Sequence, residues 1–427
     1  MLGKMFISAV LAEGSVAGLL QFGDIESLFK ASEVPVYAFV REFVKKYQAL
    51  PSPDTILAHV DEALVPHKEP AAYYYDLLVL RDTEHRLKKA MQDATQNLLP
   101  NNKQPEKALV TLSTAVMELV SRRQAKQVVD FREAHDALIA DYVAKWKTPD
   151  QYGIQFGWPT LDDIMGGAVK GDMISIIGRP AVGKTWQLLY GALHGWRQGM
   201  KLKDPTPAEI QNQTPLFVSM EMNPLAIQQR LAAMFTHLPA GQIKHAGLTS
   251  SNLQKYKDGL TLIKGHHAPF WVVDGNLTAT VEDIFMLAQY LKPGSIWIDG
   301  GYLLKHPKVS DRYQRVAENA DLIKQELAPL APTTVSWQFA RSAAKKDKKK
   351  GEKAGLEDIG YSDAIAQVSS VALGVFQDES VETLLQRVID ILKGRNGEVG
   401  KFTTNWDFIG MDFSEVLSPH VEDLQFL

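Results

Sequence analysis

Two hydrophobic patterns follow one another along this chain. Up to about residue 123, apolar residues such as Val36, Val40 and Val44 recur every three or four positions, which is typical of amphipathic helices. From Phe156 onward, short apolar runs alternate with amphipathic stretches. The short runs predict strands at residues 173–177, 216–219, 270–273, 296–298, 334–337 and 371–376. This alternation indicates an α/β domain with a mainly parallel twisted sheet, preceded by an all-α domain.

Breaks in these patterns divide the chain. The helices of the first part are separated by Pro51-Ser52-Pro53 and by Leu99-Pro100-Asn101-Asn102. A charged amphipathic stretch follows and stops at Thr148-Pro149-Asp150. We therefore expect a helical N-terminal domain at residues 1–123, a linker helix at 124–149 and an α/β domain at 150–427.

Composition narrows the classes of protein. The 427 residues include 46 Lys and Arg against 50 Asp and Glu, a net charge of −4, and no cysteine. The lack of cysteine excludes disulfides, cysteine-based zinc sites and iron–sulfur clusters. The mild negative charge argues against bulk attraction to nucleic acid, so any such binding needs local basic patches. No run reaches the roughly 18–20 apolar residues that span a bilayer, so we expect a soluble cytoplasmic protein without a membrane partner.

The most specific motif is a phosphate-binding loop of the form GxxxxGK[ST], between the predicted strand at 173–177 and a helical run that starts at Trp186. In such a loop backbone N–H groups surround phosphates, Lys184 supplies a positive charge at the β and γ oxygens, and Thr185 offers a hydroxyl to Mg²⁺. The sequence therefore predicts ATP and Mg²⁺ as cofactors. The predicted binding residues are Gly178, Arg179, Pro180, Ala181, Val182, Gly183, Lys184, Thr185 and Trp186.

Polar residues end or follow four further predicted strands. Asp299 follows an apolar run in the manner of a Walker B acid and is the expected magnesium partner beside Thr185. Glu221 follows another strand and is the candidate general base, because ligands bind at the carboxyl edge of open α/β sheets. Gln338 ends a third strand, where a neutral amide can sense the γ-phosphate. Asp274, at a fourth strand end, is a weaker candidate.

A basic segment lies between two strand-like runs near the C-terminus. Lys393-Gly394-Arg395-Asn396-Gly397 contains the Asn-Gly pair that favours a tight turn. Lys393 and Arg395 are then either side chains of an ordinary basic hairpin or charges delivered to the ATP of a neighbouring subunit, where they stabilise the transition state.

In order and spacing these motifs resemble those of DnaB-like replicative helicases, over about residues 150–410. The matching segments are Gly178–Thr185, Ser219–Met222 with Arg230 downstream, Ile298-Asp299, Gln338 with Arg341, and Lys393–Gly397, and Gly157–Asp162 resembles the start of that family's ATPase domain. The resemblance implies a RecA-like P-loop core in a ring, usually hexameric, with ATP at subunit interfaces and 5′→3′ translocation on single-stranded DNA. It also implies that Lys393 and Arg395 act in trans, and that residues 1–123 resemble a helical collar. Partners would include a helicase loader and, because no cysteine-type primase module is fused, a separate primase.

The sequence departs from the family pattern at two places. The family's DNA loop appears here as Asp358–Ile365, without its arginine and the acid that follows it. We expect DNA phosphates to be held instead by backbone N–H groups of this loop, with help from Arg341 and from the lysine-rich run Lys345–Lys353, which could equally be a solvated loop. The predicted loop residues are Gly360, Tyr361, Ser362, Asp363 and Ala364. The second departure is Asp299-Gly300-Gly301-Tyr302-Leu303, where the family has Asp-Tyr-Leu.

Two alternatives to a helicase remain open. One is a RecA-like DNA-binding ATPase without unwinding activity, such as a recombinase or a helicase loader, and the other is a scaffold that binds ATP only structurally. A recombinase forms open filaments, whereas a collar, a linker and a trans-acting Arg395 favour a closed ring. The complete set of Lys184, Glu221, Asp299 and Gln338 argues against the scaffold.

Overall fold

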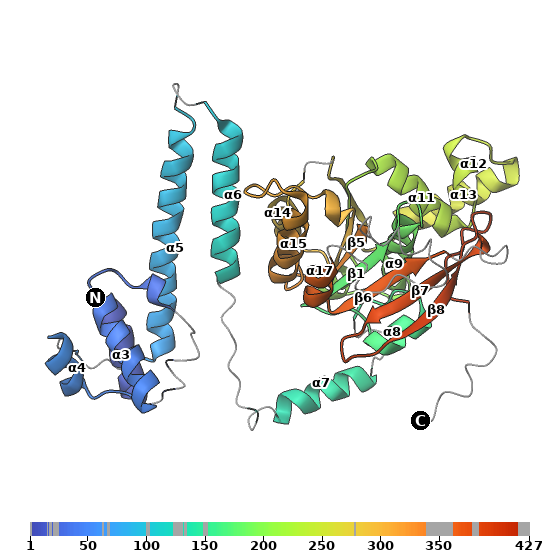
Figure 1. Ribbon diagram of the computed structural model, residues 1–427. Helices are drawn as coiled ribbons and strands as arrows, with labels where there is room; N and C mark the ends of the chain where they lie inside the picture. The colour runs from blue at the N-terminus through green and yellow to red at the C-terminus, as the bar shows by residue number, and fades with distance from the viewer. Residues whose placement is uncertain are drawn as a thin grey trace, which may run out of the picture. The chain divides into compact units, whose positions relative to one another are not determined.

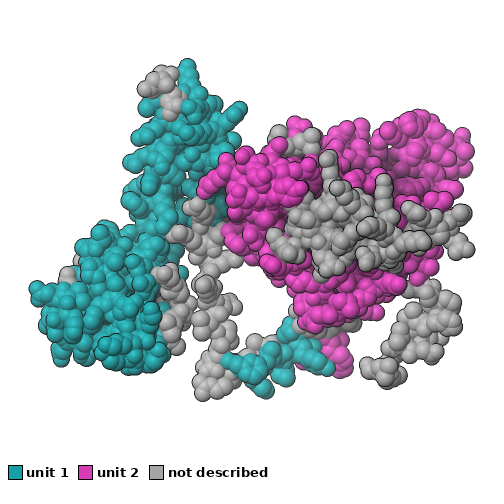
Figure 2. Space-filling model, in the orientation of Figure 1, with its two compact units in different colours: residues 1–142 teal, residues 143–427 magenta. Residues whose placement is uncertain are grey.

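The computed structural model describes residues 2–14, 16, 19, 25–61, 64–65, 69–99, 103–122, 131, 135–147, 153–276, 279–338, 362–377 and 384–416. The chain forms two compact units, residues 1–142 and 143–427 (Figure 2). The boundary falls inside helix α7 (His135–Lys147), within the segment predicted as a linker helix. The three-part division at residues 123 and 149 stays a prediction.

The first unit is helical. Its elements are α1 (Leu2–Glu13), the 3-10 turn η1 (Glu26–Leu28), α3 (Val34–Tyr47), α4 (Pro53–Val60), α5 (Ala71–Gln96) and α6 (Pro105–Arg122). Proline lies in the first turn of α3 and of α4, where its missing N–H costs nothing. The predicted breaks at Pro51–Pro53 and after Leu99 separate helices, and α5 and α6 pack side by side as an antiparallel pair (Figure 1).

A buried carboxylate joins three helices of this unit. Glu33, 1% exposed, precedes α3 and accepts hydrogen bonds from the N–H groups of Gly3 and Lys30, each at 3.1 Å. Arg81 of α5 donates to both of its oxygens, at 3.2 and 2.7 Å. Burial by itself raises the pKa of Glu33, but the hydrogen bonds from Arg81 and the backbone outweigh it and hold the pKa well below its usual range.

The second unit is an α/β domain. Its helices are α8 (Pro159–Met165), α9 (Lys184–Gln198), α10 (Pro207–Asn212), α11 (Pro224–Thr236), α12 (Ala240–Lys244), α13 (Ser250–Lys264), α14 (Val281–Leu291), α15 (Arg312–Leu322) and α17 (Ser362–Val368), with 3-10 segments η4 (Gly199–Lys201) and η5 (Gly301–Leu303) and the π-helical η6 (Ile323–Leu327). Its strands are β1 (Met173–Gly178), β2 (Pro215–Ser219), β3 (Trp271–Asp274), β4 (Ser295–Asp299), β5 (Thr333–Gln338), β6 (Val371–Phe376), β7 (Gln386–Lys393) and β8 (Gly400–Asn405).

These strands form one sheet in the order β3-β2-β4-β5-β1-β6-β7-β8. The first six are parallel, and β7 and β8 are antiparallel to their neighbours. All six predicted strands are confirmed within one or two residues, and so is the turn between β7 and β8, in which the Gly397 N–H donates to Gly394 O at 3.4 Å. Gly397 has a φ of +90°, which explains the glycine after Asn396.

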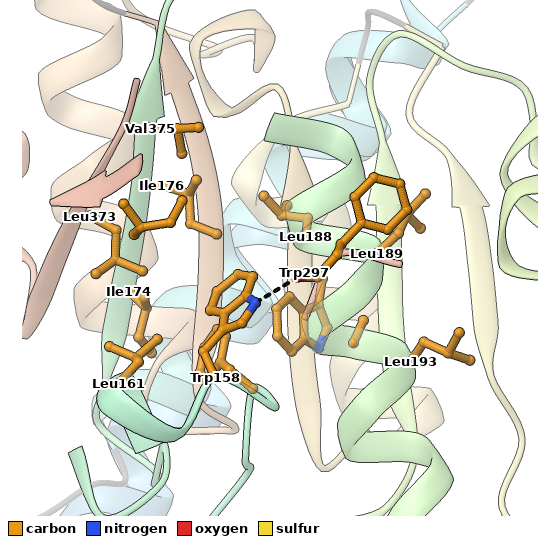
Figure 3. Close-up of a cluster of buried hydrophobic side chains, with 14 of the residues drawn as sticks. Trp158, Leu161, Ile174, Ile176, Leu188, Leu189, Leu193, Trp297, Leu373 and Val375 are labelled. Carbon is orange, nitrogen blue, oxygen red and sulfur yellow. Dashed lines mark hydrogen bonds between the residues drawn. The ribbon is translucent and has the colours of Figure 1, made fainter. Parts of the chain in front are cut away.

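A core between the sheet and α9 fixes the start of that helix. Leu188, Leu189 and Leu193 of α9 belong to one buried cluster with Trp297 of β4 and with Ile174 and Ile176 of β1 (Figure 3). Trp158, which precedes α8, is fully buried in this cluster and donates its indole N–H to Phe413 O at 3.1 Å. Because β1 and α9 share this core, the loop between them is held at both ends.

Among the described residues, none of the helices combines the length and apolar character needed to cross a bilayer.

Replacing the buried carboxylate should loosen the first unit. Glu33→Gln leaves Arg81 without its anion, and breaking a buried pair in this way costs about 3 kcal/mol. In the full-length protein, hydrogen exchange of α1 and α3 should accelerate by about two orders of magnitude, while α9 is unchanged. Glu84→Gln, which breaks the exposed pair with Lys88 at 2.5 Å, is the matched control and should leave exchange unchanged. Equal exchange in both variants would contradict the role given to Glu33.

The same carboxylate should make the first unit sensitive to acid. The folded pKa of Glu33 lies below the ordinary value of 4.5, so its stabilisation is complete at neutral pH and is lost as the pH falls from about 4.5 toward the lower folded pKa. Protection of α1 and α3 should therefore fall over this range in the wild type more steeply than in Glu33→Gln. Parallel pH curves for the two proteins would overturn the prediction.

Candidate active site

Parallel strand register brings four predicted residues to one edge of the sheet. β4 pairs with β2 so that Asp299 lies opposite Ser219, and Glu221 follows Ser219 by two residues. β1 pairs with β5 so that Gly178, the first residue of the phosphate loop, lies opposite Gln338. Since these strands point the same way, their carboxyl ends form a common edge. The loop, the two acids and the amide therefore converge although they span more than 150 residues of sequence.

The phosphate loop has the backbone conformation that anion binding needs. Ala181 and Gly183 have φ values of +62° and +105°, and α9 begins at Lys184. A helix N-terminus presents free N–H groups and a positive dipole end to an anion. Lys184 Nζ donates to Gly178 O at 3.0 Å and to Arg179 O at 2.8 Å. Burial lowers the pKa of Lys184 to about 8, although the carboxylates of Asp299 and Glu221 favour its charged form.

Asp299 is held through both carboxylate oxygens. Thr185 Oγ1 donates to Oδ2 at 2.8 Å, and Ser336 Oγ of β5 donates to Oδ1 at 3.0 Å. The Gly300 N–H in turn donates to Ser336 Oγ at 2.8 Å. Asp299 is only 4% exposed, and this burial raises the pKa of its carboxyl, against the two hydroxyl hydrogen bonds.

These oxygens fit Mg²⁺. The cation prefers hard oxygen ligands and usually takes one or two carboxylates together with substrate phosphates. Thr185 and Asp299 place a hydroxyl and a carboxylate side by side next to the phosphate loop. Within the described ranges, no group of three or more His, Cys, Asp and Glu residues could hold a metal by itself.

A pocket of about 460 Å³ opens at this edge of the sheet. The predicted residues that line it are Pro180, Ala181, Gly183, Lys184, Thr185, Trp186, Glu221, Asp299 and Gln338. It is also lined by Arg230, Tyr302, Ser336, Trp406 and Phe408.

Three predicted binding residues are not among those that line the pocket, and they support the phosphate loop through their backbone. The carbonyls of Gly178 and Arg179 accept from Lys184, and Val182 is buried, with its carbonyl accepting from Arg387 Nε at 3.0 Å. Asp274 is not among the residues that line this pocket, and its carboxylate instead accepts from the Asn276 N–H at 2.7 Å.

Tyr302 is a site residue that the sequence analysis did not identify. It lies in η5, directly after Gly300-Gly301, and its hydroxyl donates to Glu221 Oε1. The inserted glycines were the available signal, since they mark where the chain departs from the family pattern after Asp299.

Trp406 and Phe408 are two further site residues that could not be identified from the sequence, because they follow β8, more than 200 residues after the phosphate loop. A Cβ at Gly183 would approach the Trp406 ring within 1.9 Å, so glycine lets the loop lie directly on this indole. Trp186 stacks on Phe413 at 5.4 Å between ring centroids, and the Arg230 guanidinium lies 4.5 Å from the Trp186 ring. Arg230 thus both lines the pocket and braces its wall.

Lys393 and Arg395 lie away from this pocket. Arg395 forms an ion pair with Asp172, which precedes β1, whereas the phosphate loop follows β1. Lys393 Nζ donates to the carbonyls of Ala366 and Gln367 near the end of α17, at 2.7 and 3.1 Å. Both cations are therefore at the amino edge of the sheet, about 20 Å from the loop across the six residues of β1.

The predicted DNA contacts fall largely outside the described residues. Arg341, Gly360, Tyr361 and the lysine run lie in the segment 339–361. Ser362, Asp363 and Ala364 form the first turn of α17, and only their backbone is described. These assignments stay predictions.

Known proteins share this sequence and this fold. A family model for the DnaB-like helicase C terminal domain matches residues 153–415. A replicative DNA helicase DnaB of Treponema pallidum (strain Nichols) is 27% identical over 307 residues, which make up 68% of this chain and 63% of that protein, so the match spans less than two thirds of the relative. The replicative DNA helicase DnaC of Bacillus subtilis (strain 168) is 23% identical over 356 residues, 79% of this chain and 73% of that protein.

A solved structure titled "The Structure Of A DnaB-Like Replicative Helicase And Its Interactions With Primase" superposes with a TM-score of 0.60 at 17% identity, over 97% of this chain and 99% of that chain. At this identity the likeness concerns the fold, and it confirms the predicted RecA-like ATPase domain with a preceding helical part. Because the family model spans more than half of the chain, and includes every strand and the whole pocket, the chain belongs to the DnaB-like helicases.

Proposed function

We propose that this protein is an ATP-dependent replicative DNA helicase, which forms a homo-hexameric ring, translocates 5′→3′ on single-stranded DNA and unwinds duplex at a replication fork. The observation that carries the proposal is the convergence of Lys184, Thr185, Glu221, Asp299 and Gln338 on one pocket. A structural ATP-binding scaffold has no need of a general base and a sensor beside its phosphate loop.

Each side chain has a distinct task in ATP hydrolysis. Lys184 and the N–H groups at the start of α9 bind the triphosphate, and Thr185 and Asp299 hold Mg²⁺, which when bound neutralises phosphate charge. Glu221 accepts the proton of the attacking water. Gln338, at the end of β5, senses the γ-phosphate and leads directly into the segment predicted to contact DNA.

The position of Lys393 and Arg395 supports assembly into a ring. Their own phosphate loop lies at the other edge of the sheet, so in this subunit they are too distant to act on it. A head-to-tail neighbour can present its phosphate loop to this edge, and such a heterologous interface makes a ring when the rotation closes. We therefore assign Lys393 and Arg395 to the neighbouring subunit's ATP, where they stabilise transition-state charge.

The partners follow from the same proposal. Single-stranded DNA is the track, and its phosphates contact Arg341 and the residues Gly360–Ala364. A separate primase and a loader complete the assembly, in keeping with the relative whose structure title describes interactions with primase. The enzyme works in the cytoplasm of the bacterial or phage-infected cell, where this DNA is copied.

A forked-duplex assay tests the proposal. The wild type should unwind forks with a free 5′ tail on the encircled strand when ATP and Mg²⁺ are present. Glu221→Gln should still bind ATP but should lose at least about 100-fold in hydrolysis, the usual effect of removing a general base, and should not unwind. ATP hydrolysis by the wild type without polarity-dependent unwinding on any fork would leave the RecA-like ATPase without helicase activity as the better assignment.

Subunit mixing tests the trans role of Arg395. Arg395→Ala should reduce ATP hydrolysis about 1,000-fold, and Lys184→Ala should abolish it. Mixed rings of the two variants contain some interfaces with both intact side chains, so hydrolysis should return in part. Asp172→Asn is the control: it breaks the Arg395 ion pair but keeps the guanidinium, and should retain most activity if that group acts on the neighbour. No recovery in verified mixed rings would refute the trans role.

A further inference from the structure

One phenol contacts the candidate base and lies beside the candidate sensor. The Tyr302 hydroxyl donates to Glu221 Oε1, and the Gln338 side chain lines the same pocket and lowers the pKa of this phenol. Tyr302 is 6% exposed and lines the nucleotide pocket. The three residues follow or end three different strands, β2, β4 and β5, which are neighbours in the sheet.

The two glycines after Asp299 place this phenol. Gly300 has a φ of +99°, and its carbonyl accepts from the Leu303 N–H at 2.8 Å, which closes the turn η5. A Cβ on Gly301 would lie 2.5 Å from Val335 Cγ1 and 3.0 Å from the Trp337 ring, so only glycine lets the turn lie against β5. The turn then carries Tyr302 back over the strand ends to Glu221.

The hydrogen-bond capacities of the three side chains fit a chain with one direction. Burial, followed by the Glu221 carboxylate, raises the pKa of Tyr302, so the phenol keeps its single proton at neutral pH. Its O–H donates a hydrogen bond to Glu221, and its oxygen can accept one from the amide of Gln338. This hydrogen bond reaches Oε1, and those of the described residues include none to Oε2 of Glu221, so the phenol orients the base without occupying the oxygen that would accept the proton from water.

We propose that Tyr302 is a positioning residue that links the sensor Gln338 to the base Glu221 and thereby couples DNA binding after β5 to ATP hydrolysis. The inference rests on the proposed function, because it assigns the base and the sensor to that reaction. A movement at the end of β5 changes the partner of the phenol, and the phenol changes the orientation of the carboxylate.

Tyr302→Phe removes only the hydroxyl and tests the link in the full-length protein. ATP hydrolysis is measured with and without poly(dT), together with KM for ATP and the melting temperature. The DNA-stimulated kcat should fall about tenfold, the effect of one lost hydrogen bond to a charged group, while KM changes less than about twofold. Tyr190→Phe is the matched control, since it removes a partly buried hydroxyl that donates to Gly157 O at 3.1 Å outside the pocket, and it should keep the stimulation.

A double-mutant cycle separates coupling from a merely structural effect. If the hydrogen-bonded chain transmits the signal, Tyr302→Phe combined with Gln338→Ala should be no slower than Gln338→Ala alone. The link is overturned if the losses of the two single variants multiply in the double variant. It is also overturned if Tyr302→Phe keeps the kcat and the DNA stimulation of the wild type. If the wild type itself hydrolyses ATP without any response to DNA, the proposed function fails instead, and the same cycle on DNA-independent hydrolysis still tests whether Tyr302 positions Glu221.

Discussion

The buried carboxylate of Asp299 is the contact on which the nucleotide site depends. Asp299 ends β4 and accepts one hydrogen bond from the Thr185 hydroxyl at the start of α9 and another from the Ser336 hydroxyl of β5. It therefore connects the phosphate loop to two strands of the sheet. A buried acid without such partners is costly, and here each oxygen is satisfied by a group that must itself be in place. One residue at the centre of the sheet thereby fixes the start of α9, and with it the end of the phosphate loop, relative to β4 and β5.

The direction of the last strands has a different consequence. β7 runs antiparallel to β6, so its end with Lys393 and the following Arg395 lies at the edge opposite the phosphate loop. In the proposed ring, such a chain contributes half of a composite site at each edge of its sheet. The mild net charge of −4 agrees with this proposal, because a ring needs basic residues only where it meets DNA and nucleotide.

Local patterns predicted much of the fold and of the site. The six parallel strands and the β7–β8 turn were predicted because each depends on neighbouring residues, such as an apolar run or an Asn-Gly pair. Tyr302, Trp406 and Phe408 were not predicted as site residues. Their contacts with Glu221 and the phosphate loop join segments some 80 to 220 residues apart, which no periodicity records. Arg230 was recognised only as a family arginine, and its packing on Trp186 is a tertiary contact.

By itself the sequence predicted the chemistry of this protein. The phosphate loop and the acids after apolar strands are short motifs whose predicted roles follow from residue type and spacing, whereas the trans role of the terminal basic turn came from the family resemblance. Only the tertiary structure decided which strand ends meet and on which edge each charge lies. The physical reason is that hydrogen-bond register between distant strands, not local periodicity, places Asp299 opposite Ser219, Gly178 opposite Gln338, and Arg395 beside Asp172.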